Sequence, residues 1–255
     1  MAEVVIVPSN VEGGEIAAAA IASLIAAKPD AVLGLATGST PLTTWSALAA
    51  RSLDLSRVRG FALDEYVGLP VGHPESYGAV ITREVVEPLG LSPSLVRVPG
   101  DDGPARGAGE RYEAAIHAAG GVDLQILGIG RTGHIGFNEP GSSLASLTRI
   151  KTLTQQTRID NARFFDGRVD DVPMHCITQG LGTILRARHL VLLAWGSAKA
   201  AAIASALEGA VSASTPGSAV QLHPHVTVIV DEDAAAQLEH ADYYRYAWEN
   251  RHLVE

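Results

Sequence analysis

Two loops of this chain follow runs of apolar residues and carry acid–base side chains. The first spans Phe61–Pro70, where Asp64 and the glutamate beside it follow a short apolar segment. The second spans Gly128–Pro140 and contributes His134 and Glu139. Ligands of open α/β sheets bind at the carboxyl ends of the strands, so a carboxylate held there is a candidate base. An Asp-Glu pair is also typical of a helix N-cap or an ion pair, and the second loop is what favours a proton-transfer site.

A third loop, Leu35–Pro41, has the composition of an anion-binding turn. The small residues Gly38, Ser39 and Thr40 would expose backbone N–H groups and hydroxyls at the positive end of the following helix. Pro41 is expected at the first helical position. This pattern predicts a phosphate site, and an ordinary strand-to-helix turn capped by Ser or Thr is the alternative.

The sequence predicts neither a nucleotide site nor a metal site. The phosphate loop lacks the Gly-Lys-Ser/Thr ending of a Walker loop. The run Gly128–Gly133 matches G-x-G-x-x-G superficially, but Asn138–Pro140 would interrupt a following helix. Nine histidines are scattered singly apart from His223 and His225, and no spacing resembles a zinc site. The sequence also has no G-x-S-x-G elbow of a serine hydrolase.

The composition indicates a cytoplasmic globular protein. A formal net charge of −9 argues against a nucleic-acid or anionic-membrane partner. The single cysteine, Cys176, excludes an intrachain disulfide and fits a reducing compartment. The start, Met1–Pro8, lacks the basic segment of a signal peptide. The apolar segment Ile16–Ala27 is too short to span a bilayer and is predicted to be a buried helix.

Strands and helices are expected to alternate along the chain. The predicted strands are short and β-branched, as in a parallel sheet covered on both faces, and they span Val4–Val7, Ala31–Ala36, Val58–Leu63, Val122–Leu127, His189–Ala194 and Val226–Val230. The predicted helices span Gly14–Ala27, Leu42–Ala50, Tyr77–Leu89, Gly107–Ala119, Cys176–Arg186 and Ser197–Leu207. This alternation predicts one α/β domain over residues 1–255, with a doubly wound, mostly parallel, Rossmann-like sheet and helices on both faces.

The chain resembles the glucosamine-6-phosphate deaminase family in a collinear set of motifs that covers nearly its whole length. These include Thr37–Pro41, Leu63–Pro70, His73–Tyr77, Gly133–Pro140, Ser142–Ser146, Thr148–Thr154, Asn161–Phe165, Leu181–Thr183, Gly196–Ala200 and Gln221–Pro224. The resemblance implies conversion of glucosamine 6-phosphate and water to fructose 6-phosphate and ammonia, without metal or organic cofactor. It also implies a homo-oligomer, with a hexamer as one option. The 6-phosphogluconolactonases share the wider superfamily, but the Asp-Glu-Tyr-Val-Gly-Leu-Pro and Phe-Asn-Glu-Pro runs favour the deaminases.

The resemblance also implies a role for each side chain of the two acid–base loops. Asp64 matches the base that moves a proton from carbon 2 to carbon 1 of the sugar. His134 matches the group that exchanges a proton with the ring oxygen, a task suited to imidazole. Glu139 matches the carboxylate that orients His134 and stabilises its cationic form.

Ligand-binding residues follow from the same resemblance. The phosphate is expected on the 38–40 loop and on the charged residues Arg163 and Lys199, although a surface ion pair is the alternative for either residue. Ser142, Arg149 and Lys151 match an allosteric site that some family members have for N-acetylglucosamine 6-phosphate. The segment around Tyr243–Tyr246 does not align cleanly on the tyrosine expected there.

One position departs from the family pattern. Thr132 stands where Asp or Asn is usual, which puts the ring-opening step in question and leaves the galactosamine epimer open as a substrate. A neutral loop position is the alternative for Thr132. Two rival functions also remain open: a sugar-phosphate lactonase, which would have no proton for Asp64 to remove, and a sugar-phosphate sensor without catalysis.

Overall fold

The core of the protein is a seven-stranded parallel sheet. The computed structural model describes residues 3–251. Neighbouring strands of the sheet follow the order β1-β10-β9-β6-β2-β3-β5, and every pairing is parallel. Their bounds are Glu3–Val7, Val226–Asp231, His189–Ala194, Leu124–Gly128, Val32–Leu35, Arg59–Ala62 and Val96–Arg97 in that order. The six predicted strands are confirmed, and the two-residue edge strand β5 is added to them.

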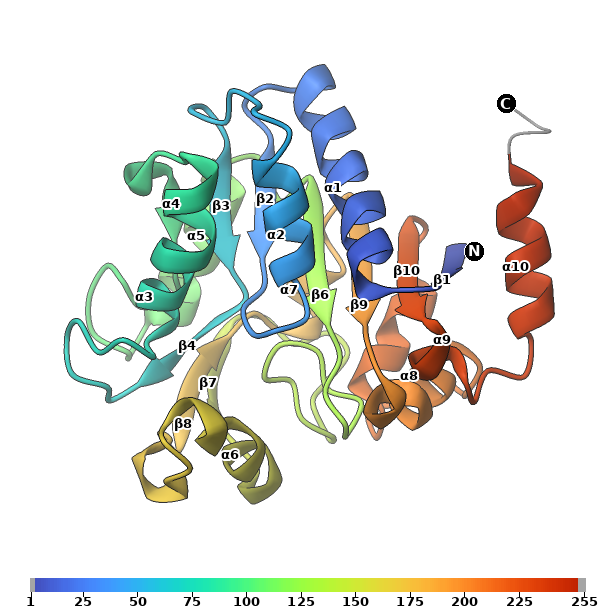
Figure 1. Cartoon of the computed structure of the whole chain (residues 1–255). Helices are drawn as coiled ribbons and strands as arrows, with labels where there is room; N and C mark the ends of the chain where they lie inside the picture. Colours follow the sequence, from blue (N-terminus) through green and yellow to red (C-terminus); the bar gives the residue numbers. More distant parts are fainter. Residues whose placement is uncertain (1–2, 252–255) are drawn as a thin grey trace.

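Helices cover both faces of this sheet, as the sequence predicts. Helices α1 (Asn10–Ala27) and α2 (Leu42–Ala49) lie over one face (Figure 1). Helix α5 (Ala108–Ala118) covers the other, where the Tyr112 ring packs edge-on against Phe61 at 5.6 Å between centroids. The remaining α-helices are α3 (Tyr77–Ile81), α4 (Glu87–Leu89), α6 (Gln155–Asn161), α7 (Leu181–Ile184), α8 (Ala200–Leu207), α9 (Glu232–Ala235) and α10 (Ala241–Glu249). A π-helical segment, Thr82–Val86, joins α3 to α4, so the helix predicted over Tyr77–Leu89 is continuous.

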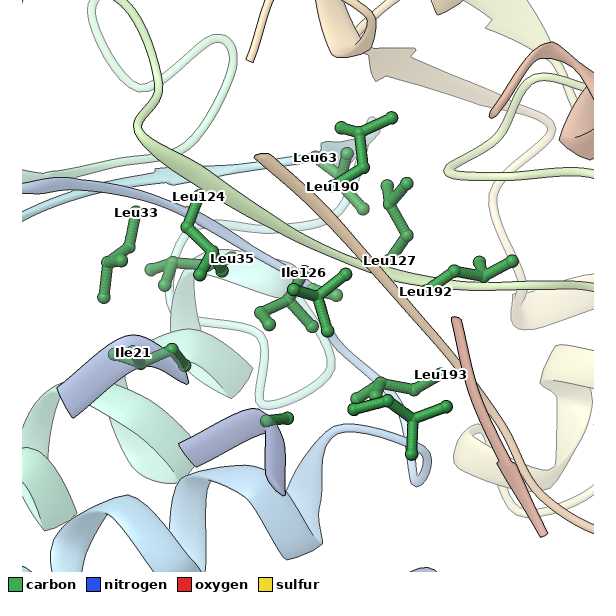
Figure 2. Packing of buried hydrophobic residues seen from close by; sticks show 14 of the residues in the cluster. Ile21, Leu33, Leu35, Leu63, Leu124, Ile126, Leu127, Leu190, Leu192 and Leu193 are labelled. Atoms are coloured by element: carbon green, nitrogen blue, oxygen red, sulfur yellow. The ribbon is translucent and has the colours of Figure 1, made fainter. Parts of the chain in front are cut away.

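The two faces of the sheet are packed with aliphatic side chains of alternating direction. Leu33 and Leu35 point to the side of Ile21 from α1, whereas Leu127 and Leu190 point to the opposite side (Figure 2). All five side chains are buried. Burial on both faces explains why the strands are nearly continuous apolar runs, as is typical of parallel sheets.

A second, three-stranded antiparallel sheet was not predicted. Its order is β4-β8-β7, with β4 spanning Asp64–Val67, β8 spanning His175–Thr178 and β7 spanning Arg149–Thr152. Together with α6 it lies beyond one end of the main sheet (Figure 1). The helix predicted over Cys176–Arg186 is therefore wrong at its start, because a short apolar run has no periodicity that separates strand from helix. Part of the loop expected over Phe61–Pro70 is also a strand, since Asp64 begins β4.

Helix α1 has the length and composition that a membrane-spanning helix needs, and it does so alone among the helices of residues 3–251. The helix is longer than the predicted segment and begins at Asn10, where the Ser9 side chain accepts a hydrogen bond from the Glu12 N–H. One side of α1, which includes Ala17, Ile21 and Ile25, is buried in the core of the domain. This packing explains its apolar composition, although its length was underestimated from the sequence.

Candidate active site

Four segments at the carboxyl edge of the main sheet hold predicted catalytic and substrate-binding residues, and Arg163 comes separately from the 3-10 turn after α6. These segments follow β2, β3, β6 and β9, and the strand order places the chain's change of winding direction between β2 and β6. Ligands of doubly wound sheets bind at such a switch point. A pocket of about 550 Å³ lies there, and its lining includes Gly38, Ser39, Thr40, Asp64, His134, Arg163 and Lys199. Seven of the residues predicted for catalysis and substrate binding therefore share one cavity.

Asp64 is buried at the junction between β3 and β4, where it is the first residue of β4. Burial, and then the negative charge of Glu65, raise the pKa of Asp64 to about 8, while a hydrogen bond from the backbone of Phe137 acts in the opposite direction. A carboxylate with a raised pKa is a stronger base once it is ionised. The geometry therefore suits Asp64 to accept a proton from a carbon atom of a bound ligand.

Glu65 has a different task from its neighbour. Its Oε1 accepts hydrogen bonds from the N–H groups of Tyr66 and Tyr77 at 2.7 and 2.8 Å, and its Oε2 accepts one from Gly78 at 2.7 Å. These donors include the first amides of α3, so Glu65 satisfies a helix N-terminus. The N-cap of α3 is Ser76, so Glu65 is not itself the cap but binds two amides of that helix from β4, while Asp64 faces the pocket.

His134 forms a three-membered polar cluster with Glu139 and Thr132. The imidazole Nδ1 lies 3.3 Å from Oε2 of Glu139 and 2.9 Å from the Thr132 hydroxyl, which in turn donates to the same Oε2 at 3.2 Å. Burial acts to raise the pKa of Glu139, but the hydrogen bond and charge of His134, with those of neighbouring hydroxyls, outweigh it and hold this pKa below its usual value. An ionised Glu139 can orient the imidazole and stabilise its cation.

The second oxygen of Glu139 is held by residues that the sequence did not single out. Oε1 accepts hydrogen bonds from the hydroxyls of Thr154, at 3.3 Å, and Thr157. Thr154 is also the N-cap of α6 and accepts a hydrogen bond from the Thr157 N–H at 3.1 Å. The first turn of α6 therefore fixes the carboxylate. A capping threonine before a short helix is visible in the sequence, but its contact with Glu139 is not.

Gly130 explains the glycine pattern of the 128–133 loop. A Cβ atom at this position would overlap the imidazole ring of His134. The backbone of Gly130 also accepts the Gly133 N–H at 3.0 Å and donates to the His134 carbonyl at 2.8 Å, which closes a tight turn. No helix follows this loop before the end of the Phe137–Pro140 segment. The glycines of this loop therefore allow its backbone to pack closely around the His134 ring.

Helix α2, which follows the 38–40 loop, begins without a side-chain cap. Gly38 has a φ of 88°, which favours glycine, and α2 begins at Leu42 as predicted, but Pro41 is its N-cap and not its first helical residue. This N-cap makes no side-chain hydrogen bond, so the alternative of a Ser or Thr cap does not describe the turn. The hydroxyls of Ser39 and Thr40 remain on the pocket wall, next to a helix N-terminus.

Three cationic side chains, those of Lys199, Arg163 and Arg131, lie near one another in the lining of the pocket. Lys199 ends the 3-10 turn Ser197–Lys199 and donates to the Ile129 carbonyl at 2.7 Å. Burial, and then the positive charge of Arg163, lower the pKa of Lys199. The guanidinium of Arg163 lies 4.7 Å from the centroid of the Phe164 ring. Arg131, which was not among the predicted residues, also lines the pocket, and its Nη1 lies 3.8 Å from Oδ1 of Asp160. An anion at this end of the pocket would relieve the repulsion among these cations.

Comparison with known protein families matches residues 12–229 to the family described as glucosamine-6-phosphate isomerases/6-phosphogluconolactonase. The chain belongs to this family. Proteins named glucosamine-6-phosphate deaminase are 61% identical in Bifidobacterium longum strain NCC 2705, over 98% of both chains. In Streptomyces coelicolor the identity is 59%, over 98% of this chain and 97% of the relative.

Solved members of the glucosamine-6-phosphate isomerase/6-phosphogluconolactonase family share this fold. A structure described as a monomeric glucosamine-6-phosphate deaminase superposes with a TM-score of 0.88 at 40% identity and covers 92% of this chain and 99% of its own. The 6-phosphogluconolactonase from Trypanosoma brucei has a TM-score of 0.76 at 18% identity, over 93% of this chain and 99% of its own. The second likeness shows the fold alone, whereas the first extends to the sequence.

The family's expected regulatory residues lie outside the pocket. Arg149 and Lys151 are half-buried in β7 while the residues between and after them are exposed, so the two side chains share one face of the strand. Arg149 Nη1 donates to Asn138 Oδ1 at 2.7 Å, beside the catalytic loop. The Ser142 side chain is buried. A regulatory role for these residues stays a prediction.

Proposed function

We propose that this protein is a glucosamine-6-phosphate deaminase, which converts glucosamine 6-phosphate and water to fructose 6-phosphate and ammonia. The observation that carries the proposal is the pocket itself, where Asp64 and His134 face the same cavity as Lys199 and the 38–40 loop. An aldose-to-ketose isomerisation needs a base and an acid at one end of the substrate, and an anchor for phosphate at the other. The names of the 57–61% identical relatives support the same activity.

Substrate binding begins with the phosphate. The backbone N–H groups and hydroxyls of the 38–40 loop bind the phosphate oxygens at the positive end of α2. Arg163 contributes a bidentate fork and Lys199 a point charge. With the phosphate fixed, the sugar ring extends along the pocket toward Asp64 and His134.

Catalysis then proceeds through proton transfers. His134, oriented by Glu139, moves a proton to the ring oxygen while the hydroxyl at carbon 1 loses one, and the ring opens. Ionised Asp64 takes the proton from carbon 2 and returns it to carbon 1, while the aldehyde oxygen gains a proton and the amino nitrogen loses one, which converts the amino aldehyde to a ketose imine. Water adds to the imine carbon and ammonia leaves, which yields fructose 6-phosphate. Each step uses side chains of this chain and water, and the proposal includes no cofactor.

The two rival functions fit the pocket less well. Hydrolysis of a lactone removes no carbon-bound proton from the substrate, so it would leave Asp64 without a role. The lactonase structures that superpose are 18–21% identical to this chain, and this likeness is evidence for the fold alone. A sensor without catalysis has no use for a buried carboxylate beside a histidine held by Glu139. Neither rival accounts for the raised pKa of Asp64.

The deciding experiment is an assay of the purified chain with three substrates. Ammonia release from glucosamine 6-phosphate is expected, alongside little or no acid release from 6-phosphogluconolactone. A parallel reaction with galactosamine 6-phosphate decides the epimer preference. Acid release from the lactone without ammonia release from either amino sugar would replace the deaminase with a lactonase, and activity on none of the three would favour the sensor.

Several further properties belong to this proposal. We place the enzyme in the cytoplasm, in amino-sugar catabolism that starts from N-acetylglucosamine, and as a single domain over residues 1–255, of which the first two and the last four lie outside the described residues. Its partner is a small sugar phosphate. The predicted homo-oligomer stays a prediction, because the solved deaminase at 40% identity is described as monomeric. Sedimentation of the purified chain measures the state directly.

A further inference from the structure

Trp195 joins the two segments that form the phosphate end of the pocket. It directly follows β9, and its indole Nε1–H donates to the Thr40 carbonyl at 2.8 Å. The Trp195 ring is half-buried and lines the cavity. This one bond therefore connects the loop after β2 with the turn after β9, across 155 positions of the chain.

The turn that carries Trp195 is itself fixed to the main sheet. The next residue, Gly196, donates its N–H to both carboxylate oxygens of Asp231, each at 2.9 Å, at the end of β10. The Gly196 carbonyl accepts the Lys199 N–H at 3.0 Å. The same short turn thus sets the positions of both the indole and the Lys199 ammonium group.

Helix α1 leaves room for the indole ring. A Cβ atom on Gly13 would overlap the six-membered ring of Trp195. Because Gly13 lies on the buried side of α1, the ring is enclosed between the helix and the phosphate loop. A side chain enclosed in this way has few alternative rotamers, so its N–H group points at the Thr40 carbonyl with little freedom.

We infer that Trp195 is a positioning residue for phosphate recognition. The Thr40 carbonyl lies in the peptide plane that leads to Pro41, and fixing this plane restricts the orientation of the amides before it. Trp195 thereby holds the N–H groups of the 38–40 loop at a set distance from the Lys199 ammonium group. The inference rests on the proposed function only for the identity of the sugar, since the ligand group concerned is a phosphate.

The test is the variant Trp195→Phe, which keeps an aromatic ring and removes the N–H group. Loss of one hydrogen bond predicts a KM for glucosamine 6-phosphate about three- to tenfold higher, with kcat changed less than twofold. The inhibition constant of inorganic phosphate as a competitive inhibitor should rise by the same factor. Trp248→Phe, in α10 and outside the pocket lining, is the matched control and should change neither constant.

A second variant approaches the same contact from the opposite side. Gly13→Ala should displace the Trp195 ring without replacing any residue of the pocket lining, and it should raise the inhibition constant of phosphate as Trp195→Phe does. Unchanged phosphate inhibition in both variants, or a fall in kcat with unchanged phosphate inhibition, would overturn the inference. Should the parent chain release no ammonia, calorimetric titration with inorganic phosphate compares the same variants, so failure of the proposed function and failure of this inference remain distinguishable.

Discussion

The hydroxyl oxygen of Thr132 lies 2.9 Å from Nδ1 of His134, the ring nitrogen that also faces Glu139. Because the hydroxyl donates to Glu139, its oxygen is free to accept from the Nδ1–H of the imidazole. Thr132 is thus a neutral bridge inside the acid–base cluster. The Thr132→Asp variant decides between this role and the alternative of a neutral loop position.

Replacing Thr132 with Asp is expected to speed ring opening. A carboxylate favours the imidazolium form of His134 more than a hydroxyl does, because charge-assisted hydrogen bonds are about twice as strong as neutral ones. Turnover on the cyclic substrate should rise, and the pH profile of the rate should change. Thr132→Ser, which keeps the hydroxyl, is the matched control. An unchanged rate and pH profile in Thr132→Asp would show that the bridge has no effect on ring opening.

Thr157 is expected to tune the same cluster through Glu139. Its hydroxyl donates one of the hydrogen bonds that hold the pKa of Glu139 below the usual value. Thr157→Val should therefore raise this pKa, so that the acid limb of the pH–rate profile moves to higher pH and activity at low pH falls first. The exposed residue Gln155, in the same turn of α6, gives the control variant Gln155→Ala. An acid limb at the same pH in Thr157→Val and in the parent enzyme would show that Thr157 does not affect catalysis through Glu139.

The role of Asp64 as the base is tested by the variant Asp64→Asn and by a solvent-isotope experiment on the parent enzyme. Turnover should fall by about 10²–10⁴-fold, because the amide cannot accept the carbon-bound proton. In the parent enzyme, reaction in deuterated water should place deuterium on carbon 1 of the product. Near-normal turnover in Asp64→Asn would sink the assignment.

The same variant should be more stable than the parent near neutral pH. Because the pKa of Asp64 is about 8 in the folded state and near 3.8 when unfolded, the folded chain retains a proton that the unfolded chain releases. Stability linked to this group is present below pH 4 and is lost as pH rises toward 8. Asp64→Asn should thus raise the melting temperature at pH 7.5 and change it little at pH 4. Equal differences at both pH values would point away from this titration.

The place of the candidate acid–base residues in the fold could be predicted because their segments follow strand ends. Asp64 and His134 lie in segments that follow β3 and β6, and parallel strands bring such ends to one edge of the sheet. Contacts made across the chain have no such local signal. The bond from Trp195 to Thr40 and the hold of Thr157 on Glu139 depend on tertiary packing. The strand around Cys176 was missed for the same reason, because its antiparallel partners are distant in sequence.

Phosphate recognition by the cationic residues gives a prediction with an internal control. Arg163→Ala or Lys199→Ala should raise the KM for the phosphorylated sugar, with a loss of about 1.5–3 kcal/mol for a charge-assisted contact. Reaction with unphosphorylated glucosamine, measured at matched saturation, should change far less. Equal effects on the two sugars would show that neither side chain binds the phosphate.

Arg149 carries the prediction of regulation by a second sugar phosphate. Its guanidinium donates to Asn138, the residue before Glu139, so a ligand that draws Arg149 away from this contact would alter the catalytic loop. N-acetylglucosamine 6-phosphate is expected to lower the substrate concentration that gives half-maximal rate, and Arg149→Ala should abolish that shift. Lys151→Ala should weaken the effect of the activator without touching the Asn138 contact, because Lys151 shares the face of β7 with Arg149. A hyperbolic rate curve that ignores the activator in the parent enzyme would leave Arg149 with a structural role in holding the catalytic loop.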